Sequence, residues 1–125
     1  MLELEKEVKE LQTDDYKVYF RAHSMQKLEC KRCYEHCWAL PFMVYMDAKG
    51  NLWPCIVFMG KEELKYGNIN ESSFVEIWEG DHRKKVMDYF MNMDLEANCR
   101  ELCRLDEMNR YLDQLKYPGE HVNFI

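Results

Sequence analysis

The sequence has no long apolar run, because charged or turn-forming residues interrupt every hydrophobic segment well short of a membrane span. Its first residues, MLELEKEVKELQ, are acidic and helical in character. A secretion signal instead begins with a basic stretch followed by an apolar one. We therefore expect no membrane association and a cytoplasmic location.

Positive charge is outnumbered, with 17 Lys and Arg against 23 Asp and Glu. The net charge is −6, and the one basic cluster, Arg83–Lys85, is short. A nucleic-acid surface normally needs a basic face, so we expect no nucleic-acid partner. The sequence also lacks a Ser–His–Asp, paired-carboxylate or phosphate-loop pattern, and we assign no catalytic residue. Of the histidines, only His36, beside Cys37, is placed to touch a metal site.

The length of 125 residues predicts one domain with a short accessory arm. Residues 1–29 form the expected arm, with a helix over 2–12 and a strand over 16–20. Residues 30–117 form the expected domain and residues 118–125 a C-terminal tail. A chain of this length buries a real core, so folding does not require a metal.

Six cysteines are the unusual feature of the composition. In a reducing compartment, cysteines at short spacing more often bind metal than form disulfides. They occupy three places: before a predicted hairpin, on its far strand, and at the start of the last predicted helix. These are Cys30, Cys33 and Cys37; then Cys55; then Cys99 and Cys103.

A β-hairpin is the clearest local structure. Two apolar, β-prone runs, 41–46 and 52–58, flank a polar turn that contains Gly50. Pro54 has no backbone N–H, so the second strand should break beside Cys55.

Helices are expected after this hairpin. Ser73 and Glu76 fit a capping box that opens a short helix ending at Gly80. Asp81 is expected to cap a second helix through about Asn92. A longer helix should run from Arg100 to before Pro118. Its apolar face is expected to comprise Leu105, Met108, Leu112 and Leu115. The predicted fold class is α+β, with a small hairpin followed by helices around a cysteine-ligated cluster.

Cys99 and Cys103 are four residues apart, so on a helix both would face the same side. Four thiolates suit zinc and iron–sulfur clusters alike. Structural zinc sites usually carry two CxxC pairs, and only Cys30–Cys33 has that spacing here. Zinc therefore remains an alternative at this point.

The segment Cys37-x(12)-Gly50-x(4)-Cys55 resembles the C-x(9–15)-G-x(4)-C signature of SPASM and twitch domains. These are auxiliary-cluster domains of radical S-adenosylmethionine enzymes. Three sequence blocks, residues 50–55, 66–69 and 73–78, are also similar to the sequence pattern of the family. The resemblance runs from about Cys33 to about Leu112.

The resemblance implies one [4Fe–4S] cluster held by Cys37, Cys55, Cys99 and Cys103. A full SPASM domain carries two clusters and a longer C-x(2)-C-x(5)-C-x(3)-C run, of which only Cys99-x(3)-Cys103 is present. The chain therefore looks like the shorter, single-cluster twitch form. Family analogy also allows Cys33 to take the place of Cys99. Otherwise Cys30 and Cys33 are spare thiols or hold a separate metal.

The C-x(3)-C-x(2)-C loop that binds S-adenosylmethionine is missing, and the chain is too short for the barrel of such enzymes. The chain is therefore not expected to be catalytic alone. The resemblance implies the C-terminal part of a radical S-adenosylmethionine enzyme, or a stand-alone relative, that acts in electron transfer or substrate docking. The expected partners are the radical core, in cis or in trans, and a peptide or protein substrate.

Two alternatives belong to other functional classes. One is a zinc-stabilised module that binds a peptide or protein. The other is a thiol redox protein that uses Cys30 and Cys33, although no convincing strand and helix flank that pair.

Overall fold

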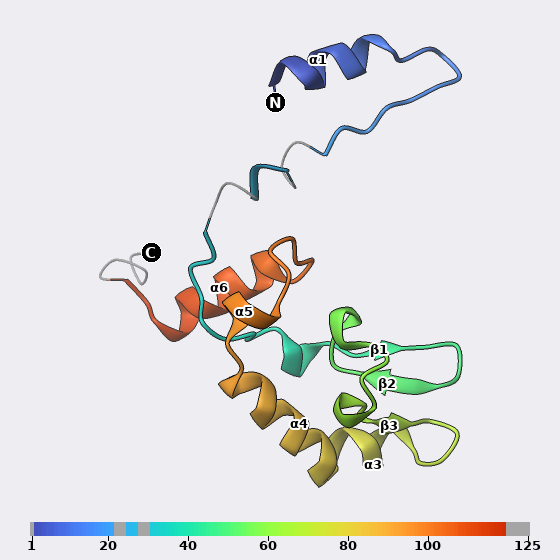
Figure 1. Cartoon of the computed structure of the whole chain (residues 1–125), viewed down its shortest axis with the longest axis vertical. Coiled ribbons are helices and arrows are strands. Elements are labelled where there is room, and N and C mark those ends of the chain that lie inside the picture. The colour runs from blue at the N-terminus through green and yellow to red at the C-terminus, as the bar shows by residue number, and fades with distance from the viewer. Residues whose placement is uncertain (1, 22–24, 28–30, 120–125) are drawn as a thin grey trace. The chain divides into compact units, whose positions relative to one another are not determined.

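The computed structural model describes residues 2–21, 25–27 and 31–119. The chain divides into two compact units, Met1–Arg32 and Cys33–Ile125 (Figure 1). Cys30 and most of the predicted C-terminal tail lie outside the described residues. No helix in the described ranges is long and apolar enough to cross a bilayer.

The first unit contains the predicted N-terminal helix, α1, over Leu2–Glu10. An ion pair between Lys9 and Glu5, 2.7 Å apart, links successive turns of this helix. The predicted strand over residues 16–20 is wrong, since these residues form no regular structure. A strand needs a partner strand for its backbone N–H and C=O groups, and the described residues of this unit include no strand with which residues 16–20 could pair.

The second unit has a three-stranded antiparallel sheet in the order β1-β2-β3. Strands β1 (Tyr45–Met46) and β2 (Asn51–Trp53) form the predicted hairpin. Strand β2 ends at Trp53, directly before Pro54, as predicted. Strand β3 (Gly67–Asn68) pairs with β2 and was not anticipated from the sequence.

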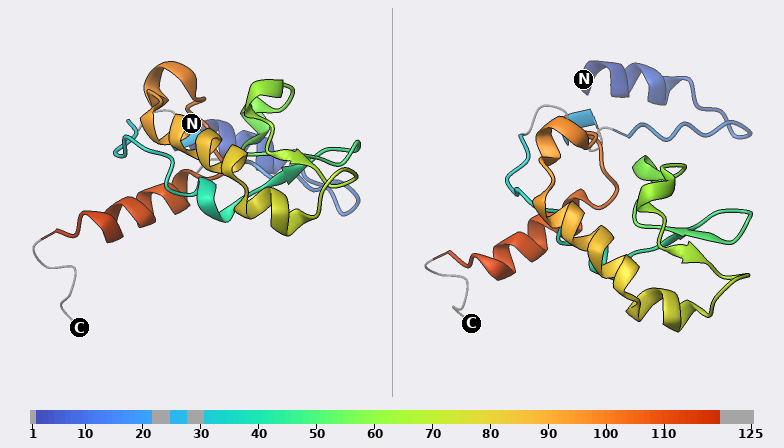
Figure 2. Two further views of the ribbon diagram at one scale, coloured as in Figure 1. Left: turned by 90° about the horizontal axis from the view of Figure 1, so that it is seen from below. Right: turned by 60° about the horizontal axis from the view of Figure 1, so that its bottom comes forward.

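Helices follow the sheet, so the predicted α+β class is confirmed. The α-helices are α3 (Phe74–Glu79), α4 (Asp81–Asn92), α5 (Leu95–Asn98) and α6 (Asp106–Lys116). Short 3₁₀ helices, η2 (Leu40–Phe42), η3 (Ile56–Phe58) and η4 (Glu62–Leu64), lie between the strands and just before them. Helix α4 leads from α3, beside the sheet, towards α5 (Figures 1 and 2).

The predicted capping box at the start of α3 is confirmed. The Ser73 hydroxyl accepts from the backbone N–H of Glu76, and the Glu76 carboxylate accepts from the N–H of Ser73. The predicted cap of α4 is wrong: Gly80 is its N-cap, and Asp81 is the first helical residue.

The helix predicted from Arg100 begins later, at Asp106. A separate short helix, α5, precedes it, because the Asp94 carboxylate caps it by accepting from two backbone N–H groups. Cys99 ends α5 as its C-cap, and Cys103 lies in the connection to α6. The expectation that both cysteines occupy the first turn of one helix is therefore wrong.

One hydrophobic core joins the sheet to α3 and α4. Phe58 and Phe90 pack edge to face, with ring centroids 4.9 Å apart. Phe74 is 44% exposed and stacks on Trp78. The core comprises Tyr34, Leu40, Leu52, Cys55, Phe58, Leu64, Tyr66, Ile77, Val86, Phe90, Met93 and Leu95.

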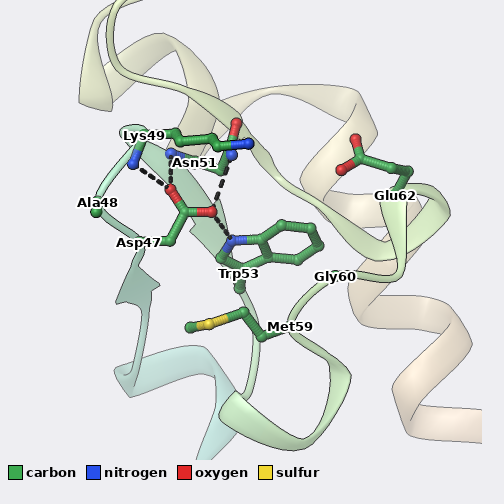
Figure 3. Close-up of a pocket in the computed structure, with 8 residues that line it drawn as sticks. All are labelled: Asp47, Ala48, Lys49, Asn51, Trp53, Met59, Gly60 and Glu62. Carbon is green, nitrogen blue, oxygen red and sulfur yellow. Dashed lines mark hydrogen bonds between the residues drawn. The ribbon is translucent and has the colours of Figure 1, made fainter.

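The hairpin turn is organised by the carboxylate of Asp47 (Figure 3). It accepts hydrogen bonds from the backbone N–H groups of Lys49 and Asn51, at 2.8 and 3.0 Å. It also accepts from the side chains of Asn51 and Trp53, both at 2.9 Å. Gly50 has a φ of +81°, which glycine tolerates best. This network fixes the register of the strand that leads to Cys55.

The side-chain hydrogen bonds from Asn51 and Trp53 hold the pKa of Asp47 well below its usual range. A depressed carboxyl pKa stabilises the fold above the ordinary value of 3.8, and this stabilisation is lost as pH falls through the folded-state pKa. We predict that Asp47→Asn weakens the dependence of thermal stability on pH below about pH 4. Thermal unfolding followed by circular dichroism across this range is the measurement.

The matched control is Asp88→Asn, on the exposed side of α4. It should leave the pH dependence as in the parent protein. Identical acid profiles for Asp47→Asn and the parent would contradict the role given to Asp47.

Candidate metal centre

Four of the cysteines lie at the ends of short helices or in the irregular segments beside helices. Cys37 lies three residues before η2, and Cys55 is the N-cap residue of η3. Cys99 and Cys103 come from the end of α5 and the turn before α6. Cys55 is buried, and the other three are partly buried. Such positions leave a sulfur near the surface without exposing it fully.

The same four sulfurs influence one another electrostatically. The pKa of the Cys37 thiol is raised to about 11, mainly by burial and to a smaller extent by charges on Cys103, Cys99 and Cys55, against a lowering hydrogen bond from Asn109. Burial also raises the pKa of Cys55, with Cys103 contributing. Cys55, Cys99 and Cys103, from chain-distant segments, therefore lie near enough to Cys37 for their charges to act on its pKa.

Helix α6 holds the segment that carries Cys37. Three polar side chains at positions i, i+3 and i+7 of this helix bind residues 34–39. The Tyr34 hydroxyl donates to Asp106 at 3.0 Å, and Asp106 is only 4% exposed. The backbone N–H of Ala39 donates to Asn109 at 2.9 Å. The indole N–H of Trp38 donates to Asp113 at 2.8 Å.

N–H groups also point at the cysteine sulfurs. The side-chain amide of Asn109 donates to Cys37 Sγ at 3.5 Å, and the backbone N–H of Leu105 donates to Cys103 Sγ at 3.4 Å. Backbone N–H groups of Val57 and Ile56 bond to the Cys55 sulfur and partly offset the effect of burial on its pKa. A neutral thiol is a weak acceptor, whereas charged sulfur accepts strongly. The donors therefore suit thiolates that ligate a metal group.

Cys33 has different surroundings. It is exposed, and the guanidinium of Arg110 donates to its sulfur at 3.2 Å. Arg110 also forms an ion pair with Asp106 at 2.9 Å. Cys30 lies outside the described residues. His36, the one histidine beside a cysteine, packs edge to face on Trp38, with ring centroids 5.1 Å apart.

Tyr66 and Asn109 belong to this site but were not identified from the sequence. Tyr66 is 3% exposed, and its hydroxyl donates to the sulfur of Met87 at 3.1 Å. Burial raises the pKa of Tyr66 to about 12, and charges on Cys37 and Cys55 contribute. The spacing of Asp106, Asn109 and Asp113 on one helix face was an available signal for a polar contact.

Among the described residues, no three His, Cys, Asp or Glu side chains are arranged to hold a single metal ion. The fit to a cluster rests on the chemistry of the donors: four neighbouring thiols and N–H groups directed at three of them. Thiolates are the usual protein ligands of iron–sulfur clusters.

Comparison with protein families gives one match. The model of the SPASM family, described as an iron–sulfur cluster-binding domain, matches residues 37–104, more than half of the chain. The match begins at Cys37 and includes Cys55, Cys99 and Cys103. No curated protein and no solved structure matches the chain.

Thiol reactivity in the metal-free, reduced protein should follow these environments. We predict that iodoacetamide at about pH 8 alkylates exposed Cys33 first and Cys37 at least about tenfold more slowly, because the thiolate is the reactive form. The raised pKa of Cys37, near 11, keeps this thiol protonated at that pH. Peptide mass spectrometry at successive times measures both rates.

The same labelling in denaturant provides the control, since unfolding removes the effect of burial and the two rates should converge. Equal rates in the folded protein would contradict the description of the Cys37 site.

Proposed function

This chain belongs to the SPASM family of iron–sulfur cluster-binding domains, and we propose that it holds a single [4Fe–4S] cluster as an auxiliary domain. The proposal is supported by the electrostatic influence on Cys37 of three further cysteines, Cys55, Cys99 and Cys103, which come from chain-distant segments. Backbone N–H groups bond to the sulfurs of Cys55 and Cys103, and the side-chain amide of Asn109 bonds to the sulfur of Cys37.

The proposed ligands are Cys37, Cys55, Cys99 and Cys103. Cys55 is fixed by the strand break at Pro54 and by the N–H groups that follow it. Cys37 is fixed by the contact of its segment with α6. Cys33 is not included, because it is exposed and bonded to Arg110. When bound, the cluster would supply a centre for one-electron transfer.

SPASM domains occur together with radical S-adenosylmethionine cores. We place this chain in that context as the C-terminal part of such an enzyme or its separate partner. Its role there would be to transfer electrons or to dock a peptide or protein substrate. The partial burial of Cys37, Cys99 and Cys103 supports this role, since a cluster at this depth lies close to a surface where a partner can approach.

The direct test is chemical analysis of the anaerobically purified protein. We predict about four irons, with a similar amount of labile sulfide, per chain and a broad brown absorbance. Cys37→Ala and Cys55→Ala should each reduce bound iron to below about one per chain, because each removes a thiolate ligand. Cys99→Ala and Cys103→Ala should do the same.

Cys33→Ala is the matched control and should retain the iron and sulfide of the parent protein. Cluster loss in Cys33→Ala with retention in Cys99→Ala would replace Cys99 by Cys33 in the ligand set. A colourless parent protein loaded with zinc would contradict the proposed function.

A further inference from the structure

Asn109 is a fully buried polar residue in the middle of α6. It is 1% exposed and lies between Asp106 and Asp113 on the helix face that binds residues 34–39. A buried side-chain amide needs partners for its oxygen and its N–H groups, since a buried polar group without a hydrogen-bond partner destabilises the fold. The partners of Asn109 therefore indicate what its position is built to do.

The orientation of this amide is fixed by the main chain. The backbone N–H of Ala39 lies 2.9 Å from one end of the amide. A backbone N–H can only donate, so this end must be the oxygen. The NH₂ group is then directed to the other side, where it lies 3.5 Å from Cys37 Sγ. The amide thus connects the Cys37 segment to α6 at its backbone and at its sulfur.

The sulfur partner is a poor match for this donor in the neutral state. A thiol sulfur accepts weakly, whereas a sulfur that carries negative charge accepts a short and stronger hydrogen bond. The amide therefore gains most when Cys37 is bound as a thiolate to an electron-rich group. Asn109 itself has no charge and no thiol, so it does not serve as a ligand.

Resting on the proposed function above, we propose that Asn109 is a positioning residue that raises the reduction potential of the cluster through its hydrogen bond to Cys37. Reduction places additional negative charge on the cluster and its cysteine sulfurs. A hydrogen-bond donor directed at one of these sulfurs favours the reduced state over the oxidised one. Removal of the donor therefore makes the cluster harder to reduce.

Two substitutions separate this effect from a packing role. Asn109→Leu has a similar side-chain shape and removes both hydrogen bonds. Asn109→Asp keeps an acceptor for Ala39 and replaces the donor that faces Cys37 by an oxygen. We expect each variant to shift the oxidised–reduced equilibrium about tenfold towards the oxidised cluster, which corresponds to about 59 mV for one electron. The shift should be larger for Asn109→Asp, because its carboxylate adds negative charge.

The matched control is Asn98→Asp. Asn98 is exposed, adjoins Cys99 in the sequence, and donates to the backbone oxygen of Asp94. The Asn98→Asp substitution introduces a carboxylate without removing a bond to sulfur. The midpoint potential of the cluster in this variant should therefore lie near that of the parent protein.

The experiment is a redox titration of the anaerobically purified protein, monitored by electron paramagnetic resonance. Iron and sulfide per chain and far-UV circular dichroism are measured on each sample. Lowered potentials in the Asn109 variants, at parental iron content, support the inference. Parental potentials in both variants overturn it.

Loss of the fold, or of the cluster, in both Asn109 variants also overturns the inference, because Asn109 would then be structural. A parent protein without iron would instead refute the proposed function.

Discussion

The contact between α6 and the segment of residues 34–39 holds Cys37, one of the candidate ligands, in place. Cys37 is in an irregular segment before η2, and it has no strand or long helix of its own to hold it. Three side chains on α6 hold this segment through a hydroxyl, a backbone N–H and an indole N–H. Asp106 and Asn109 are almost fully buried, so their two bonds are made away from competing water. Helix α6, the last helix of the described residues, thereby positions Cys37.

Burial and hydrogen bonding act on the sulfurs in opposite directions. Burial disfavours the thiolate, and it is the main cause of the raised pKa of Cys37 and Cys55. The N–H groups directed at these sulfurs favour the thiolate and partly offset the effect. Because a metal ligand must be deprotonated, a group bound by Cys37 has to displace a proton. Burial is the larger of the two effects, so the pKa values of Cys37 and Cys55 stay raised and both thiols are protonated at neutral pH in the metal-free protein.

The hairpin and helix α3 could be predicted from the sequence because the residues that determine them are close together in the chain. A turn with Gly50, a proline directly after a strand, and a capping box all act within a few residues. The family resemblance likewise depends on residues in a fixed linear order, and the match over 37–104 confirms it. Strand β3 was missed because two residues, Gly67 and Asn68, carry no alternating pattern and pair only through tertiary contact.

The last helix was predicted with the wrong start and an incomplete account of its faces. The apolar pattern predicted a helix face that includes Met108 and Leu115, yet these side chains are 39% and 55% exposed. Asp106 and Asn109 are buried instead, because the surface that α6 packs against presents hydrogen-bond donors. Hydrophobic patterns do not show where a buried partner is polar. The positions of Cys99 and Cys103 depended on this helix start and were misplaced with it.

In the proposed site, four cysteines from distant parts of the chain bind one iron–sulfur cluster. Native mass spectrometry of the anaerobically purified chain tests this proposal, because it weighs the intact protein with whatever it binds. We predict one dominant species whose excess mass equals a single [4Fe–4S] unit, together with loss of the protons that the ligating thiols release. A dominant species that carries zinc, or no metal, would contradict it.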